Sequence, residues 1–86
     1  MVRETVRVRL FAGARAAAAR TVVEVPVPRG GLPVREIVRR LAVLHPALGP
    51  ILRVSRLVRN DEYLTRLSVR LRPGEELSVH PPYGGG

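Results

Sequence analysis

The sequence predicts one α+β domain, in which a mixed sheet of four to five strands is covered by one main helix. Three observations predict it. The 86 residues, 45% of them apolar, suit one hydrophobic core and are too few for two. Short segments with the alternating pattern of strands outnumber the single long pattern of an amphipathic helix. No internal repeat or linker interrupts their order.

The first two strands are predicted near the N-terminus. Thr5–Phe11 alternates Val and Leu with Arg, which is the period of a half-buried strand. Arg20–Val27 is again β-branched and alternating, so a hairpin of the two strands is the simplest arrangement. Between them, Ala12–Ala19 is rich in Ala but has no amphipathic pattern, and we expect a loop there.

The main helix is predicted to follow a turn at Pro28–Gly31. Pro33 suits its first position, where a missing N–H costs nothing. Glu36 and Arg40 are spaced as a favourable i,i+4 pair, and His45 ends the helix because the next residue is proline. Apolar side chains recur at helical spacing on the other side. This predicted stripe consists of Val34, Ile37, Val38, Leu41 and Leu44.

The middle of the chain is predicted to be a connector followed by two strands. Ala47–Leu52 is short, apolar and interrupted by Gly and Pro, so we expect a connector. Arg53–Arg59 returns to a strand-like pattern. Asn60-Asp61 is a candidate tight turn, and Tyr63-Leu64 could form a very short strand after it.

The last strands are predicted around a strong turn signal. Leu67, Val69 and Leu71 form another alternating apolar set. Arg72–Glu75 reads R-P-G-E, with proline and glycine at the positions that a tight turn favours. Glu76–His80 is the final strand, which we expect to face the core through Leu77 and Val79.

The composition excludes several classes of site. Cysteine is absent, which excludes disulfides, thiolate metal sites and cysteine nucleophiles. His45 and His80 are the only histidines and have no metal-ligand spacing around them, so no metal site is expected. Gly30-Gly31 matches no phosphate-binding loop. We expect no catalytic residues in this chain. No apolar run is long enough to span a membrane, and a cytoplasmic location is the expectation.

The charge allows two interpretations. All 15 basic residues are Arg, and they outnumber the acidic residues to give a net charge of +8. Such an excess is typical of an Arg-rich nucleic-acid-binding β-domain. However, the Arg residues are spread along the chain, and only Phe11, Tyr63 and Tyr83 could stack on bases. We therefore favour a compositional origin for the charge, with nucleic acid kept as the alternative partner.

The chain divides into a domain at residues 1–80 and a tail at residues 81–86. The tail reads P-P-Y-G-G-G. Pro81 and Pro82 prevent further strand pairing and favour an extended conformation. The glycines after Tyr83 lack Cβ atoms, so this thread can enter a channel that is too narrow for other residues.

Four motifs together carry a family resemblance. They are R-L-F-A after the first alternating segment, H-P-A-L at the end of the helix, R-P-G-E-E-L before the last strand, and P-P-Y-G-G-G at the end. This combination, across essentially the whole chain, resembles the MoaD/ThiS family of ubiquitin-like sulfur carriers, with the small subunit of molybdopterin synthase as its nearest form. The resemblance implies a β-grasp fold.

The resemblance also implies a chemistry at Gly86. In this family an E1-like adenylating enzyme uses ATP to adenylate the C-terminal glycine, and a sulfur donor then converts it to a thiocarboxylate. A carboxylate is a poor electrophile, and joining one of its oxygens to the phosphate of AMP supplies the leaving group. The sulfur is delivered inside the molybdopterin synthase large subunit or another sulfur acceptor. The implied carrier binds no cofactor stably, and the catalytic groups belong to its partners.

The family's functional positions fall on named residues here. Gly85 and Gly86 match its diglycine, with Gly84 before them, and Pro81 and Pro82 match its proline pair. We expect Gly84, Gly85, Pro81, Pro82 and Tyr83 to thread into the partner. Family members bind partners through an apolar patch on the sheet, which matches Phe11, Tyr63 and His80. The histidine departs from the usual apolar residue, and Tyr83 replaces a commoner small aliphatic one.

The pathway stays open at this stage. Molybdopterin synthesis is the favoured pathway, while related carriers serve tRNA thiolation, thiamin synthesis or amino-acid synthesis. A relative can also act as a ubiquitin-like protein modifier. Because this chain has no Lys, it could not build chains on its own side chains.

Overall fold

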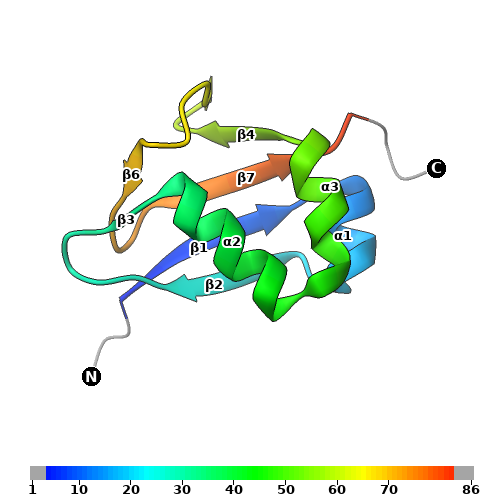
Figure 1. The fold of residues 1–86 in the computed structure, drawn as a ribbon, viewed down its shortest axis with the longest axis horizontal. Coiled ribbons are helices and arrows are strands. Elements are labelled where there is room, and N and C mark those ends of the chain that lie inside the picture. Colours follow the sequence, from blue (N-terminus) through cyan, green and yellow to red (C-terminus); the bar gives the residue numbers. More distant parts are fainter. Residues whose placement is uncertain (1–3, 83–86) are drawn as a thin grey trace.

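One mixed sheet and a layer of helices form the architecture (Figure 1). The computed structural model describes residues 4–82. The sheet contains five strands in the order β2-β1-β7-β4-β5, and two further strands, β3 and β6, form a small separate pair. The elements are β1 (Thr5–Leu10), α1 (Ala12–Ala18), β2 (Val22–Pro26), β3 (Leu32–Pro33), α2 (Val34–Leu44), a 3₁₀ turn η1 (Pro46–Leu48), α3 (Gly49–Val54), β4 (Arg56–Arg59), β5 (Glu62–Tyr63), β6 (Arg70–Leu71) and β7 (Glu76–His80). The predicted α+β architecture is confirmed.

The strands from the two ends of the chain lie side by side in the middle of the sheet. β1 and β7 are parallel, with Leu10 opposite Val79. β1 forms the predicted antiparallel hairpin with β2, while β4 is antiparallel to both β7 and β5. A parallel pair needs a long crossover connection, and the helices of this chain provide it.

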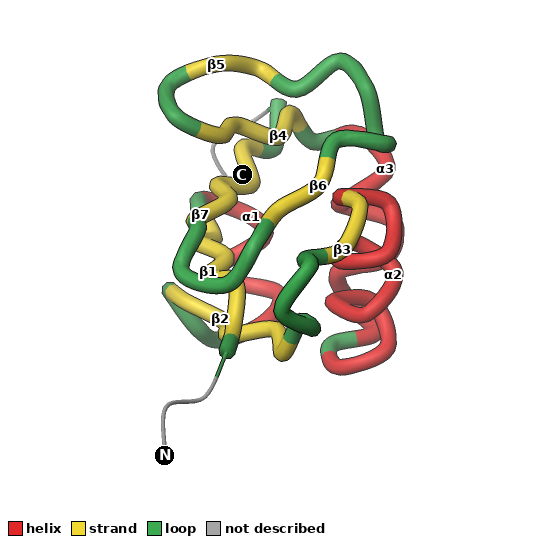
Figure 2. Tube along the Cα trace, turned by 90° about the vertical axis from the view of Figure 1, so that its left-hand side faces the viewer, coloured by secondary structure: helices red, strands yellow, loops and turns green. Residues whose placement is uncertain are grey.

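The core lies between the sheet and α2, which form two layers in Figure 2. The alternating residues of β1, β2 and β7 point inward as predicted, and α2 contributes Val34, Ile37 and Leu41, all of them fully buried. The predicted alternating set before the last turn was wrong in part, because only Leu71 lies in a strand and is buried, whereas Leu67 is 46% exposed. The strand residues of this core are Val6, Val8, Leu10, Val23, Val25, Leu57, Leu71, Leu77 and Val79. Leu44, by contrast, is 53% exposed, so the predicted stripe was wrong at its last position. The helix extends beyond the edge of the sheet there.

The predicted loop at Ala12–Ala19 was wrong, because residues Ala12–Ala18 form α1. Alanine has the highest helix propensity, which compensates for the missing amphipathic pattern. Ala14 and Ala18, four residues apart, are buried against the core. Small side chains let this short helix lie close to its neighbours.

The predicted connector at Ala47–Leu52 and the start of the next strand also need correction. η1 and α3 occupy Pro46–Val54, so the strand begins only at Arg56. Gly49 and Pro50 start α3, because proline fits the first turn of a helix. Leu48 and Leu52 are buried in the core, which explains the apolar character of this segment.

The turns agree with the predictions. Asn60 and Asp61 join β4 to β5 with left-handed φ angles of 51° and 63°. Gly74 has a φ of 89°, and the Glu75 N–H donates to the Arg72 carbonyl at 3.0 Å. The turn between β4 and β5 and the turn between β6 and β7 thus have the conformations that their residues favour.

Main-chain groups from residues 67–69 cap the beginning of α2. The Val34 N–H donates to the Val69 carbonyl at 2.8 Å, and the Arg35 N–H donates to the Leu67 carbonyl at 3.0 Å. These bonds satisfy two of the donors that a helix N-terminus leaves unpaired. None of the helices between residues 4 and 82 combines the length and hydropathy that crossing a bilayer would require.

Candidate functional site

The candidate site lies on the outer face of the sheet, at the end from which the tail departs. Strand alternation sends Leu77 and Val79 into the core and leaves His80 on the other face. Because Leu10 is opposite Val79, the residues that follow them lie side by side. The Phe11 ring stacks on the His80 imidazole, with centroids 4.7 Å apart and an interplanar angle of 11°.

Tyr63 comes to the same region through β4. Arg56 is opposite His80, and Val58 is opposite Tyr63. The Arg56 guanidinium carbon lies 5.0 Å from the centre of the Tyr63 ring, which is within range of a cation–π contact. Tyr63 is 62% exposed and Phe11 is 40% exposed, so both rings offer apolar area to a partner.

A shallow hollow of about 530 Å³ connects these residues to the tail. Its lining consists of Arg56, Val58, Asp61, Tyr63, His80, Pro81 and Pro82. Pro81 directly follows β7 and is partly buried, whereas Pro82 is exposed. The structure thus brings His80, Tyr63 and the proline pair together around this hollow. Phe11 does not line the hollow and reaches the site through its stacking on His80. Tyr83, Gly84, Gly85 and Gly86 lie outside the described residues.

Arg56, Val58 and Asp61 are site residues that the sequence analysis missed. Arg56 and Val58 flank the buried Leu57 in β4. Since side chains alternate between the two faces of a strand, the correct bounds of β4 would have predicted both residues on this face. Asp61 lies in the turn after β4. Nothing in the sequence indicates that this turn is close to the proline pair, because that proximity depends on the pairing of β4 with β7.

The chemistry available at this face is that of binding. On the same face, Arg9 donates to Glu76 at 2.9 Å, and both side chains are nearly half exposed, so the ion pair adds little stability. Among residues 4–82 no three His, Cys, Asp or Glu side chains gather as a metal would require. Aromatic rings beside an arginine are instead typical of protein interfaces.

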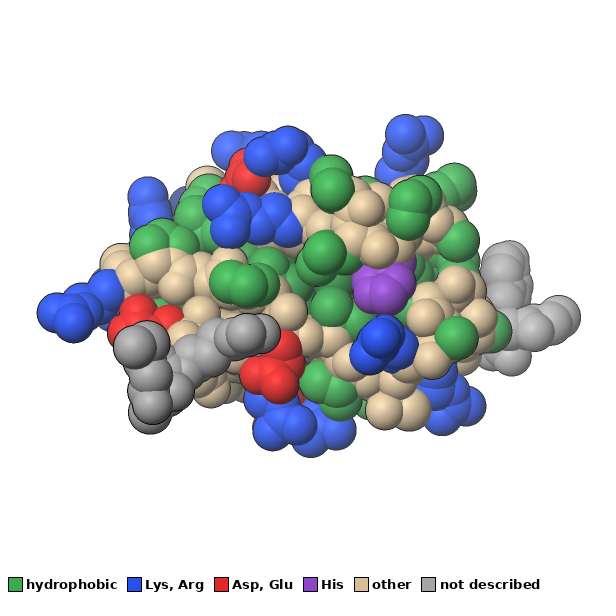
Figure 3. All heavy atoms as spheres, turned by 90° about the horizontal axis from the view of Figure 1, so that it is seen from below, with side chains coloured by type: hydrophobic (Ala, Val, Ile, Leu, Met, Phe, Trp, Pro, Cys, Tyr) green, Lys and Arg blue, Asp and Glu red, His purple; other side chains and the backbone are tan. Residues whose placement is uncertain are grey.

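The arginines form no single patch on the face seen in Figure 3. Several of their side chains lie around its margin and one lies beside the histidine near the middle, with acidic and apolar side chains between them. Nucleic-acid-binding surfaces gather positive charge into a patch or stripe. The distribution on this face is therefore closer to the compositional interpretation.

The clearest pKa shifts lie on α2, on the other side of the sheet. A hydrogen bond from Arg39 holds the pKa of Glu36 below its ordinary value, and Arg40 contributes in the same direction. The Arg39 Nε donates to Glu36 at 3.1 Å, and the Arg40 Nε donates to it at 3.4 Å. The second contact is the predicted i,i+4 pair. These charges support the helix and are not part of the candidate site.

Comparison with solved structures gives the fold and several relatives. SAMP1 of Haloferax volcanii is 28% identical with a TM-score of 0.81, and the match covers 95% of this chain and 99% of that one. A Pyrococcus furiosus protein described as molybdopterin converting factor subunit 1 is 22% identical with a TM-score of 0.80, over 93% and 99% of the two chains. A chain from a Helicobacter pylori complex of molybdopterin-converting factor subunits 1 and 2 is 23% identical in sequence, with a TM-score of 0.67. This match covers 95% of the present chain and 99% of the other. The similarities to the Pyrococcus furiosus and Helicobacter pylori proteins show a shared fold and nothing more, because the sequence identity is below 25%.

No curated protein sequence matches the chain at a significant level. The ThiS family, however, matches residues 8–86, which span almost the entire sequence. The matched region includes the stacked aromatic pair, the proline pair and the glycines after them. The five-stranded mixed sheet with its helix layer agrees with the β-grasp fold implied by the sequence motifs. This chain therefore belongs to the ThiS family.

Proposed function

We propose that this chain is a sulfur carrier whose Gly86 carboxylate is adenylated and then converted to a thiocarboxylate. The observation that carries the proposal is the ThiS family match, which extends through the proline pair and the glycines to residue 86. The position of Pro81 supports it, because this residue leaves the sheet directly after the central strand β7. A rigid strand followed by residues that cannot extend the sheet suits a tail that enters a partner.

The chemistry follows in two steps. In the first, a Gly86 carboxylate oxygen attacks the α-phosphate of ATP in an activating enzyme, and pyrophosphate leaves. In the second, hydrosulfide released by the sulfur donor attacks the carbonyl carbon, AMP leaves, and the sulfur gives its proton to solvent. The product carries sulfur in place of one oxygen. No oxidation occurs at the carbon, and no side chain of this protein needs to act as acid or base.

We place the carrier in molybdopterin synthesis. Solved structures with the same fold include a molybdopterin converting factor subunit 1 and a complex of subunits 1 and 2 from another organism. By analogy, the partner would be a large synthase subunit that receives the tail. The exposed surface of Phe11, Tyr63 and His80 would contact this subunit and the E1-like activating enzyme in turn. Carriers for tRNA thiolation, thiamin or amino-acid synthesis are the alternatives.

The decisive experiment is the intact mass of the protein after incubation with its activating enzyme, ATP and a sulfur donor. We expect one oxygen to be replaced by sulfur in the full chain. A variant that lacks Gly86 should keep its thermal unfolding midpoint and show no mass change. A Leu44→Ala variant, altered on an exposed helix residue away from the tail, serves as the control and should gain sulfur normally. Absence of both adenylate and thiocarboxylate would disprove the proposal.

A second candidate function is protein modification. The observation that favours it is the likeness to SAMP1, described as a small archaeal modifier protein, at 28% identity over 95% of this chain. In that role, a lysine amine of another protein would attack the activated Gly86 carbonyl and form an isopeptide bond. Trypsin would leave residues 71–86 of this chain on the modified lysine, because Arg72 precedes a proline and the last cleavable bond follows Arg70. Peptides with this remnant, absent from cells with the Gly86-deleted chain, would distinguish this role from sulfur transfer.

A further inference from the structure

A groove between α2, α3 and β4 lies mainly on the helix side of the sheet, and its lining also includes Arg56 and Tyr63 of the candidate site. Its volume is about 690 Å³. α2 packs over β2, and Leu64 and Val69, which follow β5, pack against the core. The hollow lies between α2 and Leu64. We call it the α2–β4 groove. Its apolar lining consists of Val38, Ala42, Leu52, Leu57, Leu64 and Leu67.

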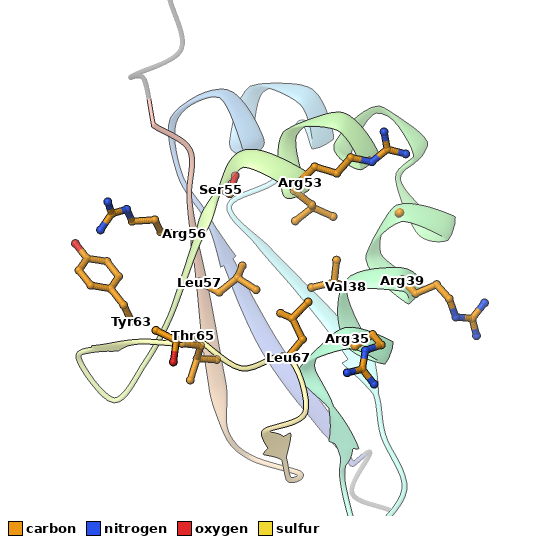
Figure 4. Close-up of a pocket in the computed structure, with 14 residues that line it drawn as sticks. Arg35, Val38, Arg39, Arg53, Ser55, Arg56, Leu57, Tyr63, Thr65 and Leu67 are labelled. Carbon is orange, nitrogen blue, oxygen red and sulfur yellow. The ribbon is translucent and has the colours of Figure 1, made fainter.

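The rim of the α2–β4 groove is basic. Figure 4 shows Arg35 and Arg39 on α2 and Arg53 on α3 around the apolar interior, with Val38, Leu57 and Leu67 inside it. Arg39 is paired with Glu36, whereas Arg35 and Arg53 form no ion pair within residues 4–82. No acidic residue is among the described residues that line the groove. An apolar interior with an unneutralised positive rim is therefore available to a ligand.

The groove suits side chains inserted from a helix better than an added strand. β4 is hydrogen-bonded to β7 on one side and to β5 on the other. The Leu64 N–H also donates to the Leu57 carbonyl at 2.8 Å. The bordering strand thus offers no open edge for strand addition, while helix recognition requires only an apolar groove and flanking charges. Leu67 lines the groove and is 46% exposed, so its side chain is available for such a contact.

We propose that the α2–β4 groove binds an amphipathic helix of a partner protein that carries carboxylates beside its apolar face. The apolar side chains of this helix would fill the interior, and its Asp or Glu side chains would pair with Arg35 and Arg53. Charge complementarity selects this occupant. A second copy of this chain, with its own charge of +8, would be repelled. The proposal goes beyond sulfur transfer and does not depend on the tail.

The test is a fluorescence anisotropy titration with a panel of labelled synthetic peptides of about four helical turns. Each peptide has Leu at helical spacing and Glu on both flanks, in a different register. A matched panel with Lys in place of Glu gives the charge dependence. Chemical shifts of the ¹⁵N-labelled full chain locate the binding site. We expect at least one acidic peptide to bind and to shift Ala42 and Leu67 amides more than those of Phe11 and His80.

Three variants make the test specific. Arg35→Glu combined with Arg53→Glu, and separately Leu67→Asp, should each weaken the acidic peptide roughly tenfold or more. Arg15→Glu combined with Arg20→Glu makes the same change in net charge on exposed residues outside the groove. This control should change the affinity by less than about threefold. Circular dichroism confirms that every variant is folded.

Three results would overturn the proposal. The first is that no peptide of the panel binds below about 1 mM. The second is an equal loss of affinity in the control double variant, which would mean unspecific attraction to the net charge. The third is that a single-stranded oligonucleotide, titrated in parallel, shifts the groove amides while the acidic peptides do not. That outcome would assign the groove to nucleic acid.

Discussion

The Phe11 ring lies nearly parallel to the His80 imidazole, at an interplanar angle of 11°, although the two residues come from opposite ends of the chain. The parallel pairing of β1 with β7 brings them together, since Leu10 is opposite Val79. Because His80 directly precedes Pro81, its stacking on Phe11 would fix the surface from which the tail departs. The strength of this contact is measurable.

A double-mutant cycle should detect the contact. We expect Phe11→Ala and His80→Ala to be less destabilising together than the sum of their single effects, with a coupling free energy of about 0.5–1.5 kcal/mol. Urea unfolding of the four proteins gives the value. Val43→Ala, an exposed residue on α2, combined with His80→Ala is the control pair and should be additive. A coupling near zero for Phe11 would mean that the rings are adjacent without stabilising each other.

Gly31 should not tolerate a side chain. Its φ is 80°, and a Cβ atom there would overlap the carbonyl oxygen of Leu71 on the paired strand β6. We expect Gly31→Ala to lower the free energy of unfolding by roughly 1–3 kcal/mol. Gly30→Ala is the matched control, because a Cβ at the neighbouring glycine meets no atom within 4 Å. Similar losses in both variants would show that the close approach to Leu71 has no consequence.

The two ends of the leucine pattern on α2 should differ in energy. Leu41 is fully buried, so Leu41→Ala should cost about 2–5 kcal/mol through lost burial and a remaining cavity. Leu44→Ala, on the same helix and more than half exposed, should cost less than about 1 kcal/mol. Urea unfolding of both variants and the original protein, fitted with one shared m-value, measures the two losses in the free energy of unfolding. Equal costs would mean that Leu44 packs against the core in solution.

Acid should weaken the Glu36 contacts. The pKa of Glu36 is lowered in the folded chain, chiefly by the hydrogen bond from Arg39. The resulting stabilisation is complete above the ordinary value of 4.5, and it is lost as the pH falls through the lowered folded-state value. Glu36→Gln should therefore reduce the dependence of unfolding free energy on pH in the acid range. The effect is expected to be small, because Glu36 is only partly buried and both arginine partners are largely exposed to solvent.

The pH dependence of Glu36→Gln must be compared with that of a variant that loses a carboxylate without arginine contacts. Glu4→Gln serves this purpose, since Glu4 is exposed and forms no ion pair in the part of the chain that the structure describes. The difference between the two variants isolates the contacts with Arg39 and Arg40. If the Glu36 variant keeps the full pH dependence of the original protein, these arginines do not stabilise the helix.

The strands and turns were predictable because their signals are local. Alternation in β1, β2 and β7, the Pro-Gly turn at residues 73–74 and the Asn-Asp turn each depend on a few neighbouring residues. α1 was missed because periodicity cannot be seen in a run of alanines, although their helix propensity and the spacing of Ala14 and Ala18 were both available. α3 was missed because Gly49-Pro50 marks a helix start as well as a loop.

The sites were predictable to different degrees. Phe11, Tyr63 and His80 could be chosen from the family resemblance, and the structure brings them to one end of the outer face. Arg56 and Asp61 could not be chosen, because their position beside the proline pair requires the pairing of β4 with β7. The α2–β4 groove likewise depends on how far α2 lies from β4, which no local pattern encodes.

The central position of β7 has a consequence for biosynthesis. β7 is the last strand of the sheet to be synthesised, yet β1 and β4 both need it as their neighbour. Contacts between residues so far apart in sequence form slowly and only after most of the chain is available. An unfinished or unfolded chain thus lacks the ordered sheet that precedes Pro81. Any enzyme that recognises both this sheet and the glycines would therefore act on folded chains and not on unfolded ones.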